Sequence, residues 1–292
     1  MIPPYYLTVM TFVCINTLLS LSIGVLAGYA GQVSLGHAAF MGLGAYASAV
    51  LAKNLHLSFW LAMPLAVVAA ALVGLVLGAI SLRLKEDFLA ITTMGLNFIV
   101  VGVLLYVPFF GRALGIGDIP SPSLAGQPLS KMGYFNLCLL LVAAAIILVW
   151  WLQRSWVGLA WRAIREVQDV AEVMGVNVSK FKLVACVIST AIAGLAGSLY
   201  AHFMLFITPY DFSFPVSIFI LTMAIFGGLG TLRGPVAGAI VLTILPEYLR
   251  FIQDYRLLTY GLLLVIIMLF QPQGLLGENS LILNRLKAWR GR

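Results

Sequence analysis

Residues 60–82 read WLAMPLAVVAAALVGLVLGAISL and contain no Asp, Glu, Lys or Arg. A helix of about 20 apolar residues is long enough to cross the hydrocarbon core of a membrane. The run 183–206, LVACVISTAIAGLAGSLYAHFMLF, has the same character. These two stretches predict membrane-spanning helices, and they decide the class of fold.

The composition of the whole chain agrees with them. Of its 292 residues, 62% are hydrophobic and only 9% are charged, and the mean hydropathy is +1.06. Soluble domains have roughly half apolar and a quarter charged residues, so this chain has too few polar side chains to cover a water-exposed surface. A soluble enzyme, a nucleic-acid-binding protein and a disordered chain are therefore excluded, and membrane lipid is the expected surroundings.

Nine apolar stretches are candidate membrane segments, which predicts an all-α polytopic fold in a single domain, 1–292. They are 6–28, 36–52, 60–82, 88–108, 135–152, 183–206, 215–232, 235–250 and 258–271. The second and the last two are short, and they are rich in glycine or bounded by proline. They fit half-helices or re-entrant pieces as well as full spans, because protein can cover their backbone.

The basic residues set the expected orientation. With the N-terminus outside and each stretch crossing once, twelve Lys and Arg residues fall inside and five outside. Lys and Arg are retained on the cytoplasmic side of membrane proteins, so the sequence predicts N-out, C-in. The Gly/Pro-rich loop 109–134 is then external, and the polar stretch 153–182 is cytoplasmic.

The cytoplasmic stretch is expected to contain one amphipathic helix. From Trp156 to Met174, apolar residues recur at three- and four-residue steps. Gly175 is placed to end this helix in a left-handed conformation, and Ser179 to cap the next one. The polar face mixes acids with bases, which suits a protein groove better than a leaflet surface, where a strongly basic face is expected. Its charged residues are Arg162, Arg165, Glu166, Asp169 and Glu172.

The sequence offers no energy source of its own. Every acidic residue falls at the end of a candidate segment or in a loop, so the sequence does not predict a proton relay within the membrane. A Na⁺ site made of carbonyls and hydroxyls stays an alternative. No Gly-Lys pair exists, and hence no phosphate-binding P-loop. The three histidines lack metal-ligand spacing, and no nucleophile elbow occurs. We expect no catalytic residue, no metal and no cofactor, and a partner to power any active transport.

Polar residues inside apolar runs are candidates for a translocation pathway. They are Gln32, Ser34, His37, Thr92, Thr93 and Asn97. The alternative for the threonines is a hydrogen bond to their own helix backbone, and the alternative for His37 is a purely structural hydrogen bond. The sequence alone leaves both alternatives open.

Glycine spacing predicts close helix packing. Small residues four apart let helix backbones approach each other in lipid, and they occur at Gly24/Gly28, Gly74/Gly78, Gly194/Ser198 and Gly230/Gly234/Gly238. The segment Gly31-x-x-Ser34-Leu35 also echoes Gly228-x-x-Thr231-Leu232. An internal duplication, common in transporters, would explain that echo.

These residues resemble a known family, the permease subunits of branched-chain amino-acid ABC importers, of the LivM type. The matching stretches cover most of the chain. They are GYAGQVSLGHAAFMGLGAY at 28–46, ALGIGDIP at 113–120, GLAWRAIREVQDVAEVMGVNVSKFKLVACVISTAIAGLAGSLYAH at 158–202, FGGLGTLRGPVAGA at 226–239, LPEYLR at 245–250 and YGLLLVIIMLFQPQGLLG at 260–277.

The resemblance implies a multi-pass permease of the bacterial inner membrane that works by alternating access. It implies a second, LivH-like permease, two cytoplasmic ATPase subunits that bind the ATP, and an external solute-binding protein. It also implies that 156–175 is the coupling helix, with Arg162, Arg165, Glu166, Asp169, Glu172 and Gly175 as coupling residues. Many such permeases carry E-A-A-x-x-x-G, and Asp169-Val170-Ala171-x-x-x-Gly175 fits that spacing.

The solute implied is a branched-chain or other small amino acid. Asn97 departs from the family, which usually has Glu there, and that departure leaves urea, an amide or another small organic solute open. A stand-alone Na⁺-coupled carrier and a membrane-embedded enzyme or assembly factor are the remaining alternatives. A second copy of this chain is also open as the partner permease.

Overall fold

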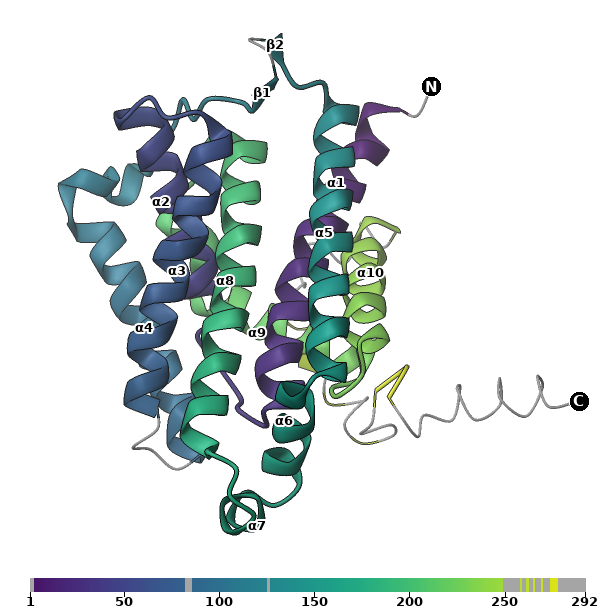
Figure 1. Ribbon diagram of the computed structural model, residues 1–292. Helices are drawn as coiled ribbons and strands as arrows, with labels where there is room; N and C mark the ends of the chain where they lie inside the picture. Colours follow the sequence, from purple (N-terminus) through teal and green to yellow (C-terminus); the bar gives the residue numbers. More distant parts are fainter. Residues whose placement is uncertain are drawn as a thin grey trace, which may run out of the picture.

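The computed structural model describes residues 3–81, 86–124 and 127–248, and then 258, 261, 262, 265, 269 and 274–277. In these residues the chain is a bundle of helices (Figure 1) with a single two-stranded hairpin. The long helices are α1 (Pro4–Ile23), α2 (His37–Asn54), α3 (Phe59–Ser81), α4 (Glu86–Tyr106), α5 (Lys131–Arg154), α8 (Val178–Met204), α9 (Phe214–Gly227) and α10 (Arg233–Tyr248). The shorter elements are the π-helix η1 (Gly24–Tyr29), the 3-10 turns η2 (Pro108–Phe110), η3 (Arg112–Leu114) and η4 (Pro209–Phe212), strands β1 (Ser123–Leu124) and β2 (Gln127–Pro128), and helices α6 (Trp156–Glu166) and α7 (Gln168–Val173).

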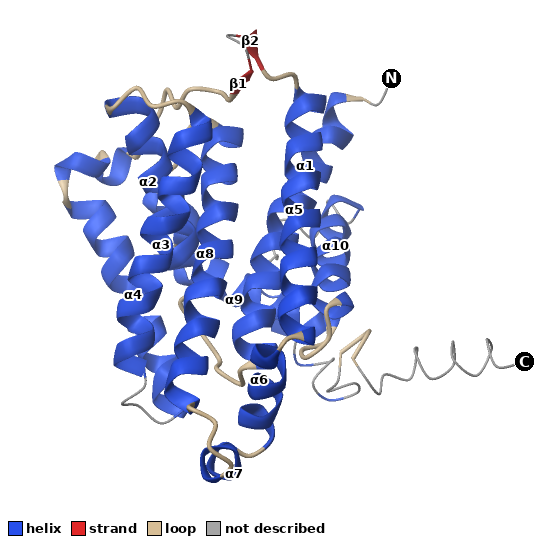
Figure 2. Cartoon of the chain, in the orientation of Figure 1, coloured by secondary structure: helices blue, strands red, loops and turns tan. Residues whose placement is uncertain are grey.

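The predicted all-α membrane fold is confirmed. Among the described residues, five helices are long and apolar enough to cross a membrane: Pro4–Tyr29, Phe59–Ile80, Phe88–Tyr106, Lys131–Arg154 and Val178–Met204. Each of the first eight candidate stretches coincides with a helix, whereas 258–271 lies mostly outside the described residues. Figure 2 shows that most of the described chain is helix and that its strands are confined to one hairpin. The count of nine and the orientation stay predictions.

Helix α8 is the centre of the bundle and packs against α1, α2 and α3. Small residues make these contacts close, as their spacing predicts. A β-carbon at Gly74 would lie 1.9 Å from the Thr190 hydroxyl, and one at Gly194 would lie 2.4 Å from Ala70 Cβ. Side-chain volume at either glycine would push α3 and α8 apart.

Three of the long helices are shorter than a full span. At 1.5 Å per residue, α2 is about 27 Å long, α9 about 21 Å and α10 about 24 Å, whereas the hydrocarbon core is about 30 Å thick. Helices α9 and α10 pack closely, since a β-carbon at Gly238 would lie 1.9 Å from the Met223 carbonyl oxygen. The helix expected over 215–232 ends earlier, at Gly227, and a turn over 228–232 leads into α10.

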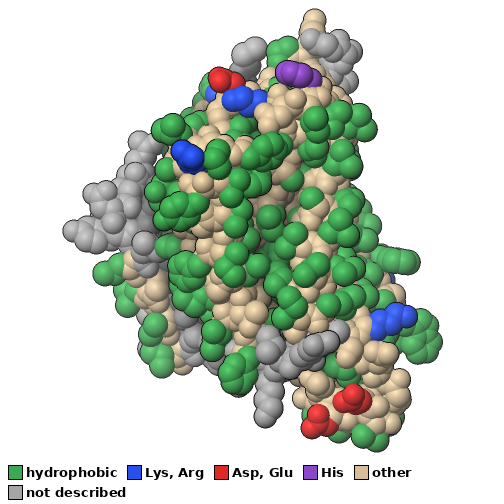
Figure 3. Space-filling view, turned by 90° about the vertical axis from the view of Figure 1, so that its left-hand side faces the viewer, with side chains coloured by type: hydrophobic (Ala, Val, Ile, Leu, Met, Phe, Trp, Pro, Cys, Tyr) green, Lys and Arg blue, Asp and Glu red, His purple; other side chains and the backbone are tan. Residues whose placement is uncertain are grey.

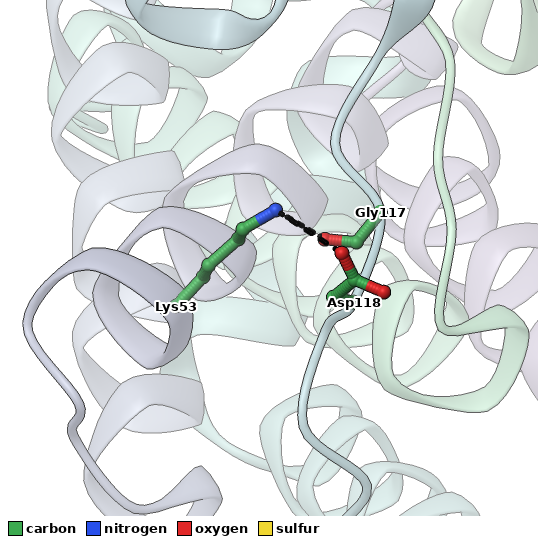
Figure 4. A network of polar contacts seen from close by, with 3 residues as sticks. All are labelled: Lys53, Gly117 and Asp118. Atoms are coloured by element: carbon green, nitrogen blue, oxygen red, sulfur yellow. Dashed lines mark hydrogen bonds and ion pairs between the residues drawn. The ribbon is translucent and has the colours of Figure 1, made fainter.

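One end of the bundle carries the N-terminus and the loop between α4 and α5 (Figure 1). The loop spans 107–130 and not 109–134, because α5 already begins at Lys131. An antiparallel bridge ties it to the end of α8, with Ile116 N–H and Ile207 N–H each donating over 2.9 Å to the other's carbonyl. Lys53, near the end of α2, donates to Gly117 O at 2.7 Å and lies 3.9 Å from the Asp118 carboxylate (Figure 4).

The opposite end carries α6 and α7, and here one expectation is wrong. The stretch 156–174 is two helices and not one, because Val167 adopts an extended conformation (φ −148°, ψ 102°) between them. The cap of the following helix α8 is Asn177 and not Ser179, since the Asn177 side chain accepts from Lys180 N–H at 3.0 Å. The chain therefore makes two bends before it re-enters the bundle.

Candidate functional site

Helix α6 is fixed to the bundle by its apolar face. Ser155 caps it, accepting from Val157 N–H at 3.2 Å. The Trp161 side chain is completely buried, and its indole N–H donates to Phe181 O in α8 at 2.9 Å. A buried tryptophan with a satisfied N–H is a strong anchor. A force applied to α6 therefore reaches the first turn of α8 directly.

Helix α7 is attached to the same helix. The Lys182 ammonium donates to the Gln168 side-chain oxygen at 2.6 Å. Ile164, Ala171 and Val178 form a small buried cluster between the three helices. Gly175 follows α7 with φ +85°, the left-handed conformation predicted for it, which glycine adopts without strain.

A groove of about 750 Å³ opens between α6, α7 and the start of α8. Its lining is mostly apolar, and several of its side chains face outward, among them Trp156, Leu159, Val167, Val170 and Met174. Met174 is 78% exposed. In Figure 3, acidic side chains stand on the lobe at the lower end of the molecule, below an apolar body. Exposed apolar surface rimmed by charge is typical of a protein-binding surface.

The structure separates the predicted coupling residues into three sets. Glu166 and Gly175 line the groove. Arg162, Asp169 and Glu172 are exposed beside it. Arg165 does not line the groove, and instead lies against Gly31 and Gly230. Within 155–177, which is fully described, no ion pair joins these charged side chains to one another.

A second site lies in the middle of the bundle, where α2 and α9 both begin. Ser217, in the first turn of α9, accepts from Ala38 N–H in the first turn of α2 at 2.9 Å. From this point the two helices run to opposite ends. Lys53 of α2 reaches the loop between α4 and α5, whereas the turn after α9 reaches α6. Two half-helices thus meet head to head at their positively polarised N-termini.

His37 is the first residue of α2 and belongs to this site. Its Nε2 lies 2.7 Å from Ser22 Oγ and 3.4 Å from Ser189 Oγ. Ser189 Oγ also donates to Ser22 O at 2.7 Å. These hydrogen bonds join α1, α2 and α8, so His37 makes structural hydrogen bonds, and its place in the pathway stays a prediction.

The two predicted threonines differ. Thr92 is half-buried, and its hydroxyl donates to Phe88 O of its own helix at 2.8 Å. Thr93 is buried, donates to Ala90 O at 2.9 Å, and also accepts from Leu35 N–H at 3.0 Å. Thr93 therefore fixes the non-helical segment 30–36 to α4, and Thr92 does not.

Asn97 lies one turn further along α4 and is fully buried. Its side-chain N–H donates to Phe212 O, just before α9, at 3.1 Å. Its Oδ1 has no hydrogen-bond partner among the described residues, and neither do Ser34 Oγ, Gln32 Oε1 and His37 Nδ1. Buried polar atoms are normally paired with protein or water. Uncharged polar atoms of the residues near the N-termini of α2 and α9 are thus left without a hydrogen-bond partner in the described part of the chain.

Three residues of this central site were not predicted from the sequence: Ser22, Ser189 and Ser217. Each is a hydroxyl in an apolar helix, a pattern shared with hydroxyls that bond only to their own backbone. The one available signal was a serine in the first turn of a short helix, as at Ser217. Among the described residues, no group of three or more His, Cys, Asp or Glu gathers in a way that fits a metal ion.

Comparison with known proteins places this architecture in one family. Residues 5–270 match the family described as branched-chain amino acid transport system / permease component. The chain is 34% identical over 291 residues to the high-affinity branched-chain amino acid transport system permease protein LivM of Escherichia coli K12, covering 91% of this chain and 68% of that protein.

More distant relatives include both permease types. The probable branched-chain amino acid transport permease protein LivM of Methanocaldococcus jannaschii is 26% identical over 251 residues, which is 76% of this chain and 70% of that protein. The high-affinity branched-chain amino acid transport system permease protein LivH of E. coli K12 is 30% identical over 139 residues, 46% of this chain and 44% of that protein. No solved structure matches the chain.

Proposed function

The chain belongs to the family of branched-chain amino acid transport permease components, and we propose that it moves branched-chain or other small neutral amino acids in a complex with three other kinds of subunit. It is a multi-pass membrane permease of an ABC importer and a transport subunit, not an enzyme. The subunits proposed to complete it are a second permease, two cytoplasmic ATPases that bind the ATP, and an external solute-binding protein.

The groove between α6, α7 and α8 is the observation that supports this proposal most. It combines exposed apolar residues with charged side chains that do not pair with one another. A surface of this kind is typical of a site that a partner protein covers. We assign it to the ATPase, because Trp161 joins α6 directly to the central helix α8.

The orientation follows from this assignment. If the groove faces the ATPase, α6 and α7 lie in the cytoplasm, and the N-terminus and the loop 107–130 lie outside. The basic residues favour the same orientation. The cytoplasmic membrane of a bacterium, where the solute-binding protein reaches the outer end, is the proposed location.

The head-to-head ends of α2 and α9 are the proposed centre of the pathway. Discontinuous helices whose N-termini meet at the midplane suit the carboxylate of an amino acid, because each end carries partial positive charge. The unpartnered oxygens of Asn97, Ser34 and Gln32 are neutral acceptors that suit its ammonium group. A site without a fixed charge fits a zwitterion, and alternating access would move helices about it.

The second permease is proposed to be a homologous but different chain. Similarity to a LivH protein extends over about half of this chain, and LivH and LivM proteins belong to systems of the same name. Two copies of this chain remain the alternative outcome. Mass measurement of the purified complex separates the two.

The proposed function predicts ATP-dependent uptake. The chain, purified with its partner permease and ATPases, is expected to carry radiolabelled leucine into proteoliposomes only with ATP on the ATPase side and binding protein on the other. Excess unlabelled valine should compete, and excess urea or acetamide should not. Leucine uptake by this chain alone under a Na⁺ gradient in ATP-free vesicles would contradict the proposal.

Asn97→Leu is expected to lower leucine uptake about tenfold, because it removes a buried hydrogen-bonding group worth about 1–3 kcal/mol from the pathway and keeps the number and branching of the side-chain heavy atoms. Thr92→Val is the matched control. Its hydroxyl bonds only to its own helix, so its uptake should stay within about twofold of the native rate. Equal uptake by both variants at equal amounts of assembled complex would show that Asn97 is not part of the pathway.

A further inference from the structure

Arg165 stands apart from the other charged residues of α6 and α7. A β-carbon at Gly230 would lie 2.3 Å from Arg165 Nη1 and 3.2 Å from Cζ, so the guanidinium lies on the backbone of Gly230. A β-carbon at Gly31 would lie 3.6 Å from Arg165 Cα and 3.8 Å from Cβ. Arg165 thus lies beside two positions that are about 200 residues apart in sequence.

Both positions are breaks in the helical path of the chain. Gly31 (φ +72°) lies near the start of the non-helical segment 30–36 that leads from η1 to α2. Gly230 (φ +90°) lies in the turn that joins α9 to α10. The π-helix η1, just before the first break, touches the second break, since a β-carbon at Gly28 would lie 2.8 Å from Gly230 N. These are the two segments whose sequences echo each other, and one precedes α2 while the other follows α9, the two helices that begin at the central site.

The turn after α9 is held firmly on another side. Leu275 N–H donates to Phe226 O at 2.9 Å, and Leu276 N–H donates to Gly227 O at 2.8 Å. Thr231 Oγ1 donates to Leu276 O at 3.1 Å. A displacement of Arg165 would therefore move the turn as a unit with α9. The C-terminal end of α9 carries partial negative charge, which favours a guanidinium there.

We propose that Arg165 is a positioning residue that transmits movement of α6 to both helix breaks, and is not a contact to the ATPase. This inference rests on the proposed function. It divides the coupling region into two parts. The groove face receives the ATPase, and Arg165, which does not line the groove, passes the movement to the segments before α2 and after α9.

The test compares Arg165→Ala with Arg154→Ala in the purified complex. Both arginines are exposed, but Arg154, at the end of α5, lies over the Trp150 ring and is outside the groove, and only Arg165 lies against the breaks. Arg165→Ala is expected to keep the ATPase bound and hydrolysing ATP, while the number of leucine molecules carried per ATP falls about tenfold, a usual size for coupling between sites. Arg154→Ala should leave that ratio unchanged. Arg165→Lys should restore part of it, because it keeps the charge and most of the length.

Each other outcome overturns the inference. Loss of the ATPase from the Arg165→Ala complex would make Arg165 a docking residue, and an unchanged leucine-to-ATP ratio would leave it no role in transmission. If Arg165→Ala does not fold, Arg165→Lys decides, because a native ratio with a compact, non-planar head group would also refute a specific contact with Gly230. Failure of the native complex to transport leucine would instead contradict the proposed function.

Discussion

Gly197→Ala is expected to destabilise the permease by about 3 kcal/mol, the upper end of the usual cost of overpacking. A β-carbon at Gly197 would lie 1.9 Å from the carbonyl oxygen of Met41 and 2.8 Å from its carbonyl carbon. Both atoms belong to the backbone of α2, which cannot yield without disturbing its own hydrogen bonds. Gly44 makes the reciprocal approach, with its β-carbon position 2.2 Å from Gly194 O. The two helices would have to separate.

Gly95→Ala provides the matched control. Gly95 lies within α4, and a β-carbon there would meet no atom within 4 Å. Alanine favours a helix over glycine by about 1 kcal/mol, so this variant should be as stable as the native chain or slightly more stable. The measurement is thermal unfolding of both variants in the same detergent. Equal melting temperatures for the two would show that α2 and α8 do not pack at backbone contact.

The class of fold could be predicted because each membrane span requires a continuous apolar segment, which is visible in the local sequence. A span such as 60–82 must be apolar along its whole length, whatever it packs against. The glycine spacings were equally informative, and Gly74 and Gly194 lie at the contacts of α3 with α8. The helix that each glycine faces depends on contacts between distant parts of the chain, and the sequence of one helix does not indicate it.

The break at Val167 could not be predicted for a related reason. Apolar residues continue at helical spacing through it, because α6 and α7 present them to the same groove. A contact from outside the stretch accompanies the break, namely the hydrogen bond from Lys182 of α8 to Gln168. Periodicity indicates which residues share an apolar face, but it does not show whether one helix or two carries them.

The central site was predicted in part. Buried polar residues such as Asn97 and Thr93 stand out in apolar runs, and the structure brings both to the segments that precede α2 and α9. Arg165 was grouped with the docking charges because helical spacing alone places it on the polar face of α6. Its contact with Gly230 depends on a turn far along the chain, so only the fold reveals it.

Met174→Asp is expected to release the ATPase from the complex. Met174 lines the groove and is 78% exposed, so a polar residue there should not disturb folding of the free permease. In the complex an aspartate would be buried in an apolar contact without a partner, which is costly. Loss of a central contact typically costs at least about 2 kcal/mol of binding energy, so the dissociation constant should rise by more than about tenfold.

Val173→Asp is the control that assigns this effect to the groove. Val173 precedes Met174 and is 88% exposed, but it does not line the groove. The two substitutions add the same charge to neighbouring positions, so any effect of net charge on α7 is common to both. Binding of the ATPase to each variant, measured at fixed salt, should therefore differ by about tenfold. If Val173→Asp weakens binding as much as Met174→Asp, the ATPase approaches the tip of α7 and the groove has another occupant.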